Sequence, residues 1–206
     1  MNEDLNRFRI ILASGSPRRK QLLEELGLEF DVITRNYSEA FPEKLKGEEI
    51  ALYLSGKKAD LFRDELSENE ILITADTIVW CNGRVLGKPS DKEEAYSMIK
   101  ALSGNTHQVI TGVTLLSASA ERSFSDITNV TFDFLTAEEI NYYIGNFKPF
   151  DKAGAYGIQE WIGLAACSRI EGSYFNVVGL PVQKLYRELI GFVKQSTSQS
   201  STKENQ

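Results

Sequence analysis

The pattern of apolar and polar positions at the start of the chain predicts a strand, a tight turn and a helix. Residues 9–14 contain four apolar residues in a row and are followed by Gly15, which is typical of a buried strand. Ser16 is a favourable N-cap residue and Pro17 suits the first helical position. Gly27 can end the helix, so we expect it to occupy the residues between Pro17 and Gly27.

Strand and helix patterns mix along the rest of the chain without strict alternation, which favours an α/β fold with a mixed sheet. The dipeptide Asn82-Gly83 predicts a hairpin, and capping boxes are expected at Ser90 and at Thr136. Further strands are expected at residues 29–34, 71–80, 85–86, 109–118 and 125–134, and further helices at 47–66, 90–102, 136–146 and 181–195. These elements predict one domain with two lobes over residues 1–195, followed by a disordered polar tail at 196–206.

Composition narrows the classes of function. The 206 residues are 42% hydrophobic and carry a net charge of -6, which argues against a basic face for nucleic acid. No apolar run approaches the roughly 20 residues of a membrane span, so we expect no membrane association and a cytoplasmic location. Cys81 and Cys167 have no metal-binding or redox spacing, so both are expected to be reduced thiols.

The turn between the first strand and the first helix is the first candidate site. Arg18 and Arg19 lie where the helix dipole disfavours cations by about 0.3–1 kcal/mol each. An anion held between these arginines, the helix N-terminus and the hydroxyls of Ser14 and Ser16 would explain the placement. The alternative is an exposed first turn whose arginines lie in water. The turn is neither a Walker A loop nor a dinucleotide fingerprint.

Two carboxylates are candidates for chemistry. Asp76 follows a buried apolar run, where a carboxylate must be paired, hydrogen-bonded or bound to metal. Near a polyphosphate it could coordinate magnesium or accept a proton from an attacking water. A structural aspartate satisfied by backbone N–H groups is equally consistent with the pattern. Glu39, in an irregular segment, is a candidate second carboxylate for the cation.

Three lysines could bind phosphate: Lys58 on the long helix, and Lys88 and Lys152 beside glycine or proline in loops. The alternative for each is a solvated surface lysine. His107 is the only histidine, so a site with two histidine ligands is excluded, and no G-x-S-x-G motif accompanies it for a serine triad. The aromatic residues at core periods are interpreted as packing: Phe132, Phe134, Tyr142 and Tyr143.

Taken together, these segments resemble the Maf family of nucleoside triphosphate pyrophosphatases. The most specific blocks are LASGSPRR at residues 12–19, ADTIV at 75–79, GKP at 87–89 and DKAGAYGIQ at 151–159. Further matching blocks lie at residues 22–23, 58–59, 91, 102–104, 107, 111–113, 172–174 and 176–181. The blocks follow the family's order over residues 10–190.

The resemblance implies hydrolysis between the α and β phosphates, which gives a nucleoside monophosphate and pyrophosphate with the help of Mg²⁺ or Mn²⁺. It also implies a mixed α/β fold like that of inosine triphosphate pyrophosphatases, with a deep cleft and often a homodimer. Asp76 matches the family's proton acceptor and a metal ligand. The other polar positions of the cleft match Ser14, Arg18, Arg19, Glu39, Lys58, Lys88 and Lys152, and Ser16 is expected to help hold phosphate.

Three positions match those that mark the subgroup directed to dTTP and UTP: Arg18, Thr77 and Gln159. The amide of Gln159 offers a donor and an acceptor, which a uracil or thymine ring can match. The chain departs from the family pattern at Glu160, where a glycine is usual, at Ser38, where an aspartate is frequent, and at 146–148, which lack a glutamate.

Two functions therefore remain open. The first is a pyrophosphatase for dTTP, UTP or modified pyrimidine nucleotides. The second is a non-catalytic nucleotide-binding regulator of cell division, because the family has also been linked with inhibition of septum formation. The two differ in whether bound nucleotide is turned over.

Overall fold

A computed structural model describes residues 3–203, and it describes side-chain surroundings for residues 5–195. The core of the fold is a seven-stranded mixed sheet with the order β2-β1-β3-β5-β6-β7, in which β4 also pairs with β3. The strands are β1 (Arg9–Leu12), β2 (Asp31–Val32), β3 (Glu70–Cys81), β4 (Arg84–Leu86), β5 (Thr106–Leu116), β6 (Glu121–Phe132) and β7 (Cys167–Glu171).

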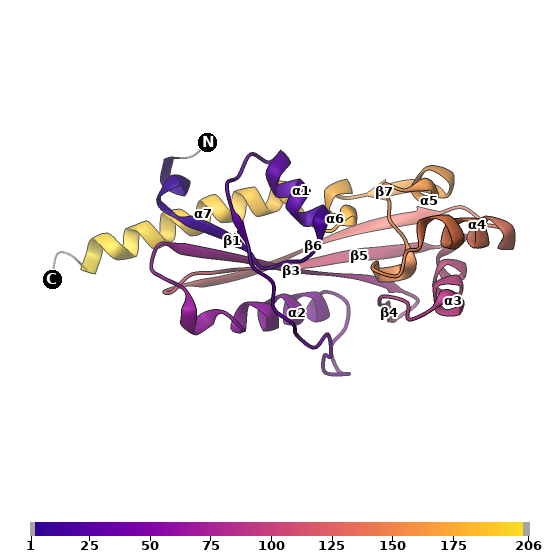
Figure 1. The fold of residues 1–206 in the computed structure, drawn as a ribbon, viewed down its shortest axis with the longest axis horizontal. Helices are drawn as coiled ribbons and strands as arrows, with labels where there is room; N and C mark the ends of the chain where they lie inside the picture. Colours follow the sequence, from indigo (N-terminus) through magenta and orange to yellow (C-terminus); the bar gives the residue numbers. More distant parts are fainter. Residues whose placement is uncertain (1–2, 204–206) are drawn as a thin grey trace.

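The long strands β3, β5 and β6 are antiparallel and form the middle of the sheet (Figure 1). Their register places Asp76 opposite Gly112, and Gly112 opposite Ser125. The short strands β1 and β2 are parallel to their neighbours at one edge. Asp76 is thus carried by a strand that is paired on one side along most of its length.

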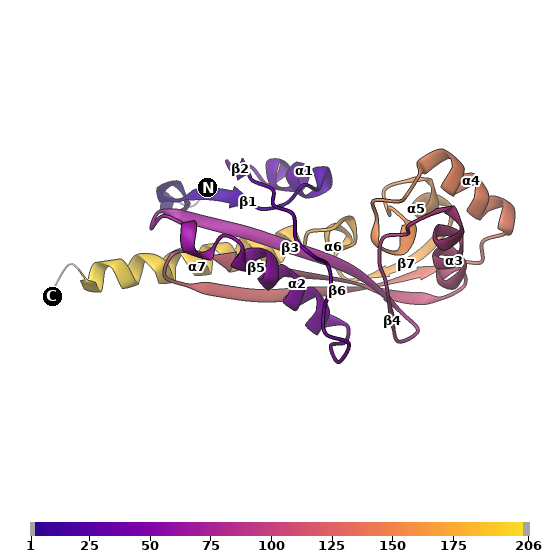
Figure 2. The same cartoon turned by 60° about the horizontal axis from the view of Figure 1, so that its bottom comes forward.

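Helices cover both faces of this sheet. Helix α2 (Glu48–Asp60) lies on one face, and α1 (Pro17–Glu25), α6 (Tyr174–Val178) and α7 (Val182–Lys203) lie on the other (Figure 1). Figure 2 shows α3 (Lys92–Leu102), α4 (Ala137–Phe147) and α5 (Trp161–Ala165) gathered at one end of the sheet with β4 and β7. Three short 3₁₀ segments complete the described part of the chain: η1 (Glu3–Arg7), η2 (Arg63–Glu65) and η3 (Ala153–Ala155).

The two largest clusters of buried apolar side chains meet at β3. One contains Ile73 and Ala75 of β3 with residues of α1 and α7, such as Leu23 and Leu189. The other contains Val79 with residues of α3, α4 and the 155–166 segment. This arrangement is consistent with the two lobes expected from the sequence, and the division into lobes stays a prediction.

The expected mixed α/β sheet with flanking helices is confirmed. The Asn82-Gly83 hairpin is also confirmed, because both residues have positive φ, 49° and 77°, as a type I′ turn requires. Thr136 heads a complete capping box on α4. The box expected at Ser90 is wrong by one residue: Asp91 is the N-cap, because its side chain accepts the backbone N–H of Glu94.

Several expected element boundaries and burials are wrong, because contacts between distant segments determine them. The 47–66 helix ends at Asp60 and resumes only as η2, and the strand expected at 29–34 shrinks to β2. Strand β7 and helices α5 and α6 were not expected. Phe132 and Tyr143 are buried as expected, whereas Phe134 is 88% exposed and Tyr142 is 51% exposed.

Helix α7 extends to Lys203, so it includes the first part of the segment expected to be a tail. Residues 196–203 contain neither proline nor glycine, which leaves no local signal to end the helix at residue 195. The remainder of that expected tail, residues 204–206, lies outside the described residues. Within the described chain, no helix combines the length and apolar composition that a membrane span requires.

One edge of β3 is left open in its middle. On this side β1 pairs with β3 as far as Ile73, whose carbonyl also accepts the Ala13 N–H at 2.9 Å. Pairing with β4 begins only at Val79. Over residues 74–78, no strand in the described part of the chain covers this edge, so its backbone groups need other partners.

Gly112 controls how closely α2 approaches the sheet. A Cβ at this position would lie 2.3 Å from the carbonyl oxygen of Ala51 and 2.7 Å from the backbone nitrogen of Leu52. The α2 backbone therefore rests directly on the position opposite Asp76. This close approach brings side chains of α2 to the β3 edge.

Gly112→Ala is expected to lower the free energy of unfolding by about 3 kcal/mol, because the added methyl forces α2 away from the sheet. Gly145→Ala in α4 is the matched control: no atom lies within 4 Å of its Cβ, and it should gain about 0.5–1 kcal/mol. Urea unfolding followed by circular dichroism measures both. Equal stabilities for the two variants would contradict the packing argument.

Candidate active site

A cleft of about 520 Å³ opens at the uncovered edge of β3. Its walls come from the turn before α1, the 34–41 segment, α2, the loop after β4, and the segments 151–159 and 177–179. All the site residues expected from the sequence line this one cleft: Ser14, Ser16, Arg18, Arg19, Glu39, Lys58, Asp76, Thr77, Lys88, Lys152 and Gln159. Residues that are far apart in the sequence are thereby brought together.

The carbonyl oxygen of Ala75 is the meeting point of two cations. It accepts a hydrogen bond from Arg19 Nη1 at 2.8 Å and another from Lys58 Nζ at 2.8 Å. Arg19 reaches it from α1 on one face of the sheet, and Lys58 reaches it from α2 on the other. The open edge is thus satisfied by positive charge instead of a neighbouring strand.

Arg19 is bound mainly by the protein itself. Its Nε donates to the Gly179 carbonyl at 2.8 Å, and its Nη2 donates to Thr77 Oγ1 at 3.0 Å. The side chain is buried, and this burial lowers the pKa of the guanidinium, while the nearby Asp76 charge acts to raise that pKa. The arginine therefore fixes the turn and places a buried positive charge in the wall of the cleft.

The serines of the turn organise the start of α1. Ser16 is the N-cap, since its Oγ accepts the Arg19 N–H at 3.4 Å. Ser14 Oγ accepts the Ser16 N–H at 3.2 Å and Arg19 Nη1 at 3.3 Å. Both hydroxyls act as acceptors in these contacts, so each keeps its own O–H to donate to an anion.

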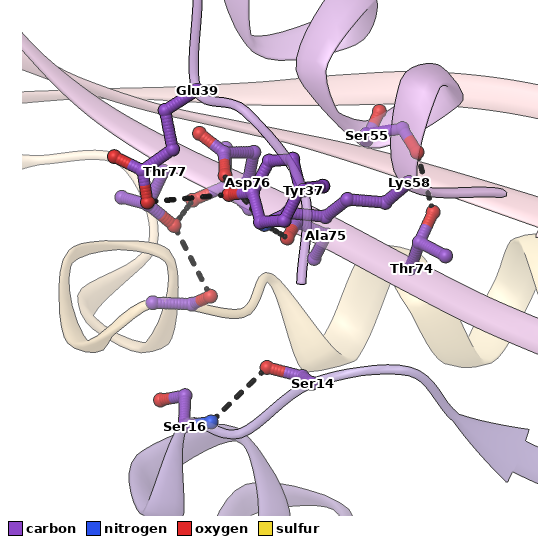
Figure 3. Close-up of polar contacts among 12 residues, drawn as sticks. Ser14, Ser16, Tyr37, Glu39, Ser55, Lys58, Thr74, Ala75, Asp76 and Thr77 are labelled. Carbon is purple, nitrogen blue, oxygen red and sulfur yellow. Dashed lines mark hydrogen bonds and ion pairs between the residues drawn. The ribbon is translucent and has the colours of Figure 1, made fainter. Parts of the chain in front are cut away.

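Asp76 belongs to a group of interacting side chains at the bottom of the cleft (Figure 3). Its Oδ1 lies 2.5 Å from Lys58 Nζ and accepts the Tyr37 hydroxyl at 3.0 Å. The Lys58 ammonium also lies 4.4 Å from the centre of the Tyr37 ring. These partners are side chains, so the alternative of a carboxylate satisfied by backbone N–H groups does not describe Asp76.

Burial changes the titration of the two partners of Asp76. It lowers the pKa of Lys58 to about 8, although the neighbouring Asp76 charge acts to raise that pKa. Burial, with the charges of Asp76 and Glu39, raises the pKa of the Tyr37 phenol. The phenol therefore remains a proton donor to the carboxylate.

Glu39 shares the Tyr37 hydroxyl, which lies 3.3 Å from Glu39 Oε1, and it forms an ion pair with Lys88. Among the described residues, no three or more His, Cys, Asp or Glu side chains are grouped as a metal site. Two carboxylates that meet at one hydroxyl nevertheless fit Mg²⁺, which protein sites often bind through one or two carboxylates plus substrate phosphates and water.

A chain of alternating charges forms the opposite wall. Arg18 Nη1 lies 3.1 Å from Asp151 Oδ2, and Lys152 Nζ lies 2.7 Å from Asp151 Oδ1. Lys152 also lies 3.1 Å from Glu160 Oε1. Lys152 is buried, whereas Asp151 is more than half exposed. Glu160 thus points into the wall of the cleft and takes part in this network.

The residues expected to set nucleotide choice differ in their surroundings. Thr77 Oγ1 contacts Arg19, Thr111 Oγ1 at 2.9 Å and the Gly179 carbonyl at 3.3 Å, so it stabilises the buried arginine. Gln159 is exposed on the cleft wall, where its amide can reach a ligand. The roles of Thr77, Gln159 and Arg18 in specificity stay predictions.

Sequence reasoning missed three residues of this network. Tyr37 lies in an irregular segment with no periodicity to mark it. Tyr143, whose hydroxyl donates to Glu160, follows a core period that predicts only packing. Asp151 directly precedes Lys152 in the block at residues 151–159. These adjacent opposite charges could have been used to predict their ion pair.

The chain is similar in sequence to proteins of one known family. The family model described as Maf-like protein matches residues 9–192. A protein of Phocaeicola vulgatus named dTTP/UTP pyrophosphatase is 55% identical over 190 residues, which cover 92% of this chain and 98% of the relative. One with the same name from Flavobacterium johnsoniae is 50% identical over 193 residues, which cover 94% of this chain and 100% of the relative.

A solved structure of a nucleoside-triphosphatase (dITP/XTP pyrophosphatase) from Mycobacterium abscessus aligns with 91% of this chain and 97% of its own. The sequence identity is 12% and the TM-score is 0.44.

Arg19→Lys is expected to lower the free energy of unfolding by about 3 kcal/mol, because an ammonium cannot span the carbonyls of Gly179 and Ala75 as the guanidinium does. Arg18→Lys serves as the control, since its ion pair with Asp151 reaches solvent and should change stability by less than about 1 kcal/mol. Urea unfolding compares the two. If both substitutions lowered the free energy of unfolding by less than about 1 kcal/mol, the hydrogen bonds of Arg19 would not fix the turn as described.

Proposed function

This chain belongs to the family of Maf-like proteins, and on that basis we propose that it hydrolyses dTTP or UTP to the nucleoside monophosphate and pyrophosphate. The observation that carries the proposal is the grouping of the expected cations around Asp76 in one cleft. The names of the relatives, at about half identity over nearly the whole chain, supply the reaction and the substrates. Modified pyrimidine nucleotides are included as candidate substrates.

Charge in the cleft suits a triphosphate. Six cationic side chains and three carboxylates line it, although the whole chain has a net charge of -6. The positive charge is therefore concentrated where a polyanion would bind, in surroundings of lower dielectric than bulk water. A broad basic surface is not needed, and we propose neither nucleic acid nor a membrane as a partner.

The phosphates would lie against the N-terminus of α1, where the hydroxyls of Ser14 and Ser16 can donate to them. Arg18 and Lys152 would contact the same phosphates when substrate oxygens replace Asp151, and Lys88 would do so when they replace Glu39. Gln159 would pair with the pyrimidine ring, and Arg18 and Thr77 would assist in choosing the nucleotide.

Asp76 would accept the proton of the attacking water. Its Oδ1 pairs with Lys58 and accepts the Tyr37 hydroxyl, so two contacts hold the carboxylate in place for this role. Arg19 would contribute charge from behind the edge of β3 without leaving its carbonyl partners.

A divalent cation, Mg²⁺ or Mn²⁺, is the proposed cofactor, with Asp76 and Glu39 as its protein ligands. When bound, such an ion neutralises charge on the phosphate oxygens.

We further propose a homodimer and a cytoplasmic location. The shallow groove beside Gln159 carries Leu164, 87% exposed, and Tyr174, 43% exposed, which a second copy of the chain could cover. The unpaired thiols of Cys81 and Cys167 suit a reducing compartment.

The purified protein with Mg²⁺ is expected to release pyrophosphate, not orthophosphate, from dTTP and UTP. Separate assays of the two products on a panel of normal and modified nucleoside triphosphates test this. Orthophosphate alone would show that a different bond is cut. Tight nucleotide binding with no product would favour the regulatory alternative, in which the protein acts on cell division without catalysis.

Asp76→Asn is expected to reduce kcat by at least about 100-fold, the low end for loss of a general base. Asp133→Asn, an exposed aspartate outside the cleft, should leave kcat unchanged. Unfolding curves establish that both variants are folded at the assay temperature. Near-normal turnover of Asp76→Asn would exclude Asp76 as the proton acceptor.

A further inference from the structure

Lys152 is a buried cation whose orientation must be fixed by its neighbours. Its side chain is 9% exposed, and its ammonium contacts two carboxylates, Asp151 at 2.7 Å and Glu160 at 3.1 Å. An ammonium has three N–H donors; one is bonded to Asp151, and the contact with Glu160 is an ion pair, so a donor remains for a ligand in the cleft. The positions of the two carboxylates decide where that donor points.

The two carboxylates are held very differently. Asp151 is 59% exposed and is shared with Arg18, so a bound anion can replace it on both cations. Glu160 is 22% exposed and uses its other oxygen, Oε2, to accept the hydroxyl of Tyr143. Glu160 is therefore the more firmly placed of the two.

Tyr143 anchors Glu160 from the core. It is fully buried in α4, and its oxygen accepts the Gly157 N–H at 3.0 Å, so its single proton is available for Glu160. Burial and the neighbouring Glu160 raise the pKa of this phenol, which keeps it a donor. The anchor joins α4 to the segment that carries the cleft residues.

Gly157 supplies the room for this arrangement. A Cβ there would lie 2.8 Å from the carboxyl carbon of Glu160, so the carboxylate rests directly over the glycine backbone. The chain of contacts from the Gly157 N–H through Tyr143 and Glu160 to Lys152 is continuous. Glu160 also directly follows Gln159. The residue proposed to contact the base is therefore adjacent in sequence to the residue that contacts Lys152, which is proposed to bind phosphate.

We propose that Glu160, anchored by Tyr143, is a positioning residue that aims the Lys152 ammonium at the substrate phosphates. The inference rests on the proposed function. Asp151 is the partner that yields to the triphosphate, and Glu160 is the partner that stays. Because Glu160 acts through Lys152, its contribution must disappear when Lys152 is removed.

A double-mutant cycle tests this dependence. Glu160→Gln keeps the size of the side chain but removes the charge, and it is expected to lower kcat/KM for UTP about 10-fold. Lys152→Met alone should cost about 100-fold. In the Lys152→Met background, Glu160→Gln should change kcat/KM by less than about 2-fold.

Tyr143→Phe provides a second, independent arm that leaves both charges in place. It should lower kcat/KM in the same direction as Glu160→Gln and should likewise have no further effect in the Lys152→Met background. Glu138→Gln, an exposed glutamate on α4, is the control and should match the wild type. Urea unfolding shows which variants are folded under assay conditions.

A full 10-fold loss from Glu160→Gln in the Lys152→Met background would mean that Glu160 acts independently of Lys152, and so would overturn the proposal. An unchanged kcat/KM in Glu160→Gln alone would do the same. If the wild type binds UTP without releasing pyrophosphate, the proposed function fails, and the same cycle measured on the Kd for UTP still decides the role of Glu160. If it neither binds nor hydrolyses UTP, both proposals fail.

Discussion

The open edge of β3 between its pairing with β1 and its pairing with β4 is the constraint from which the site follows. A backbone carbonyl in a largely buried position must find a donor, because leaving it unpaired costs about 1–3 kcal/mol. The Ala75 carbonyl finds two, Arg19 and Lys58, one from each face of the sheet. Satisfying the backbone with cations makes the edge electropositive, and Asp76, the next residue, provides the opposite charge.

Residues far apart in the chain bring these two cations to the Ala75 carbonyl. The bare backbone of Gly112 lets α2 settle on the strand opposite Asp76, which brings Lys58 within reach. The N-cap at Ser16 fixes the first turn of α1, from which Arg19 crosses to Gly179 and Ala75. Helices α1 and α2, on opposite faces of the sheet, are therefore placed so that Arg19 and Lys58 meet at the same edge of β3.

The sequence was sufficient for features governed by neighbouring residues. The strand–turn–helix around Ser16, the hairpin at Asn82 and the capping box at Thr136 depend on local geometry, and each was predicted. Contacts between distant segments were not predictable. Nothing local indicates that Tyr37 reaches Asp76, that Glu160 meets Tyr143, or that an arginine in a first turn is buried. The family blocks identified most of the cleft residues but not these links between them.

The two adjacent arginines illustrate why residue type alone could not assign roles. The sequence predicts that both arginines bind the anion and that Arg18 also takes part in nucleotide choice. In the structure, most of the Arg19 donors are bonded to protein oxygens, whereas Arg18 is paired only with the exposed Asp151 among the contacts found in the described chain. A guanidinium bound to buried carbonyls is costly to move, while one bound to an exposed carboxylate exchanges readily with another anion. We therefore propose direct phosphate contact for Arg18, and for Arg19 the role of a fixed charge that the triphosphate would meet on entering the cleft.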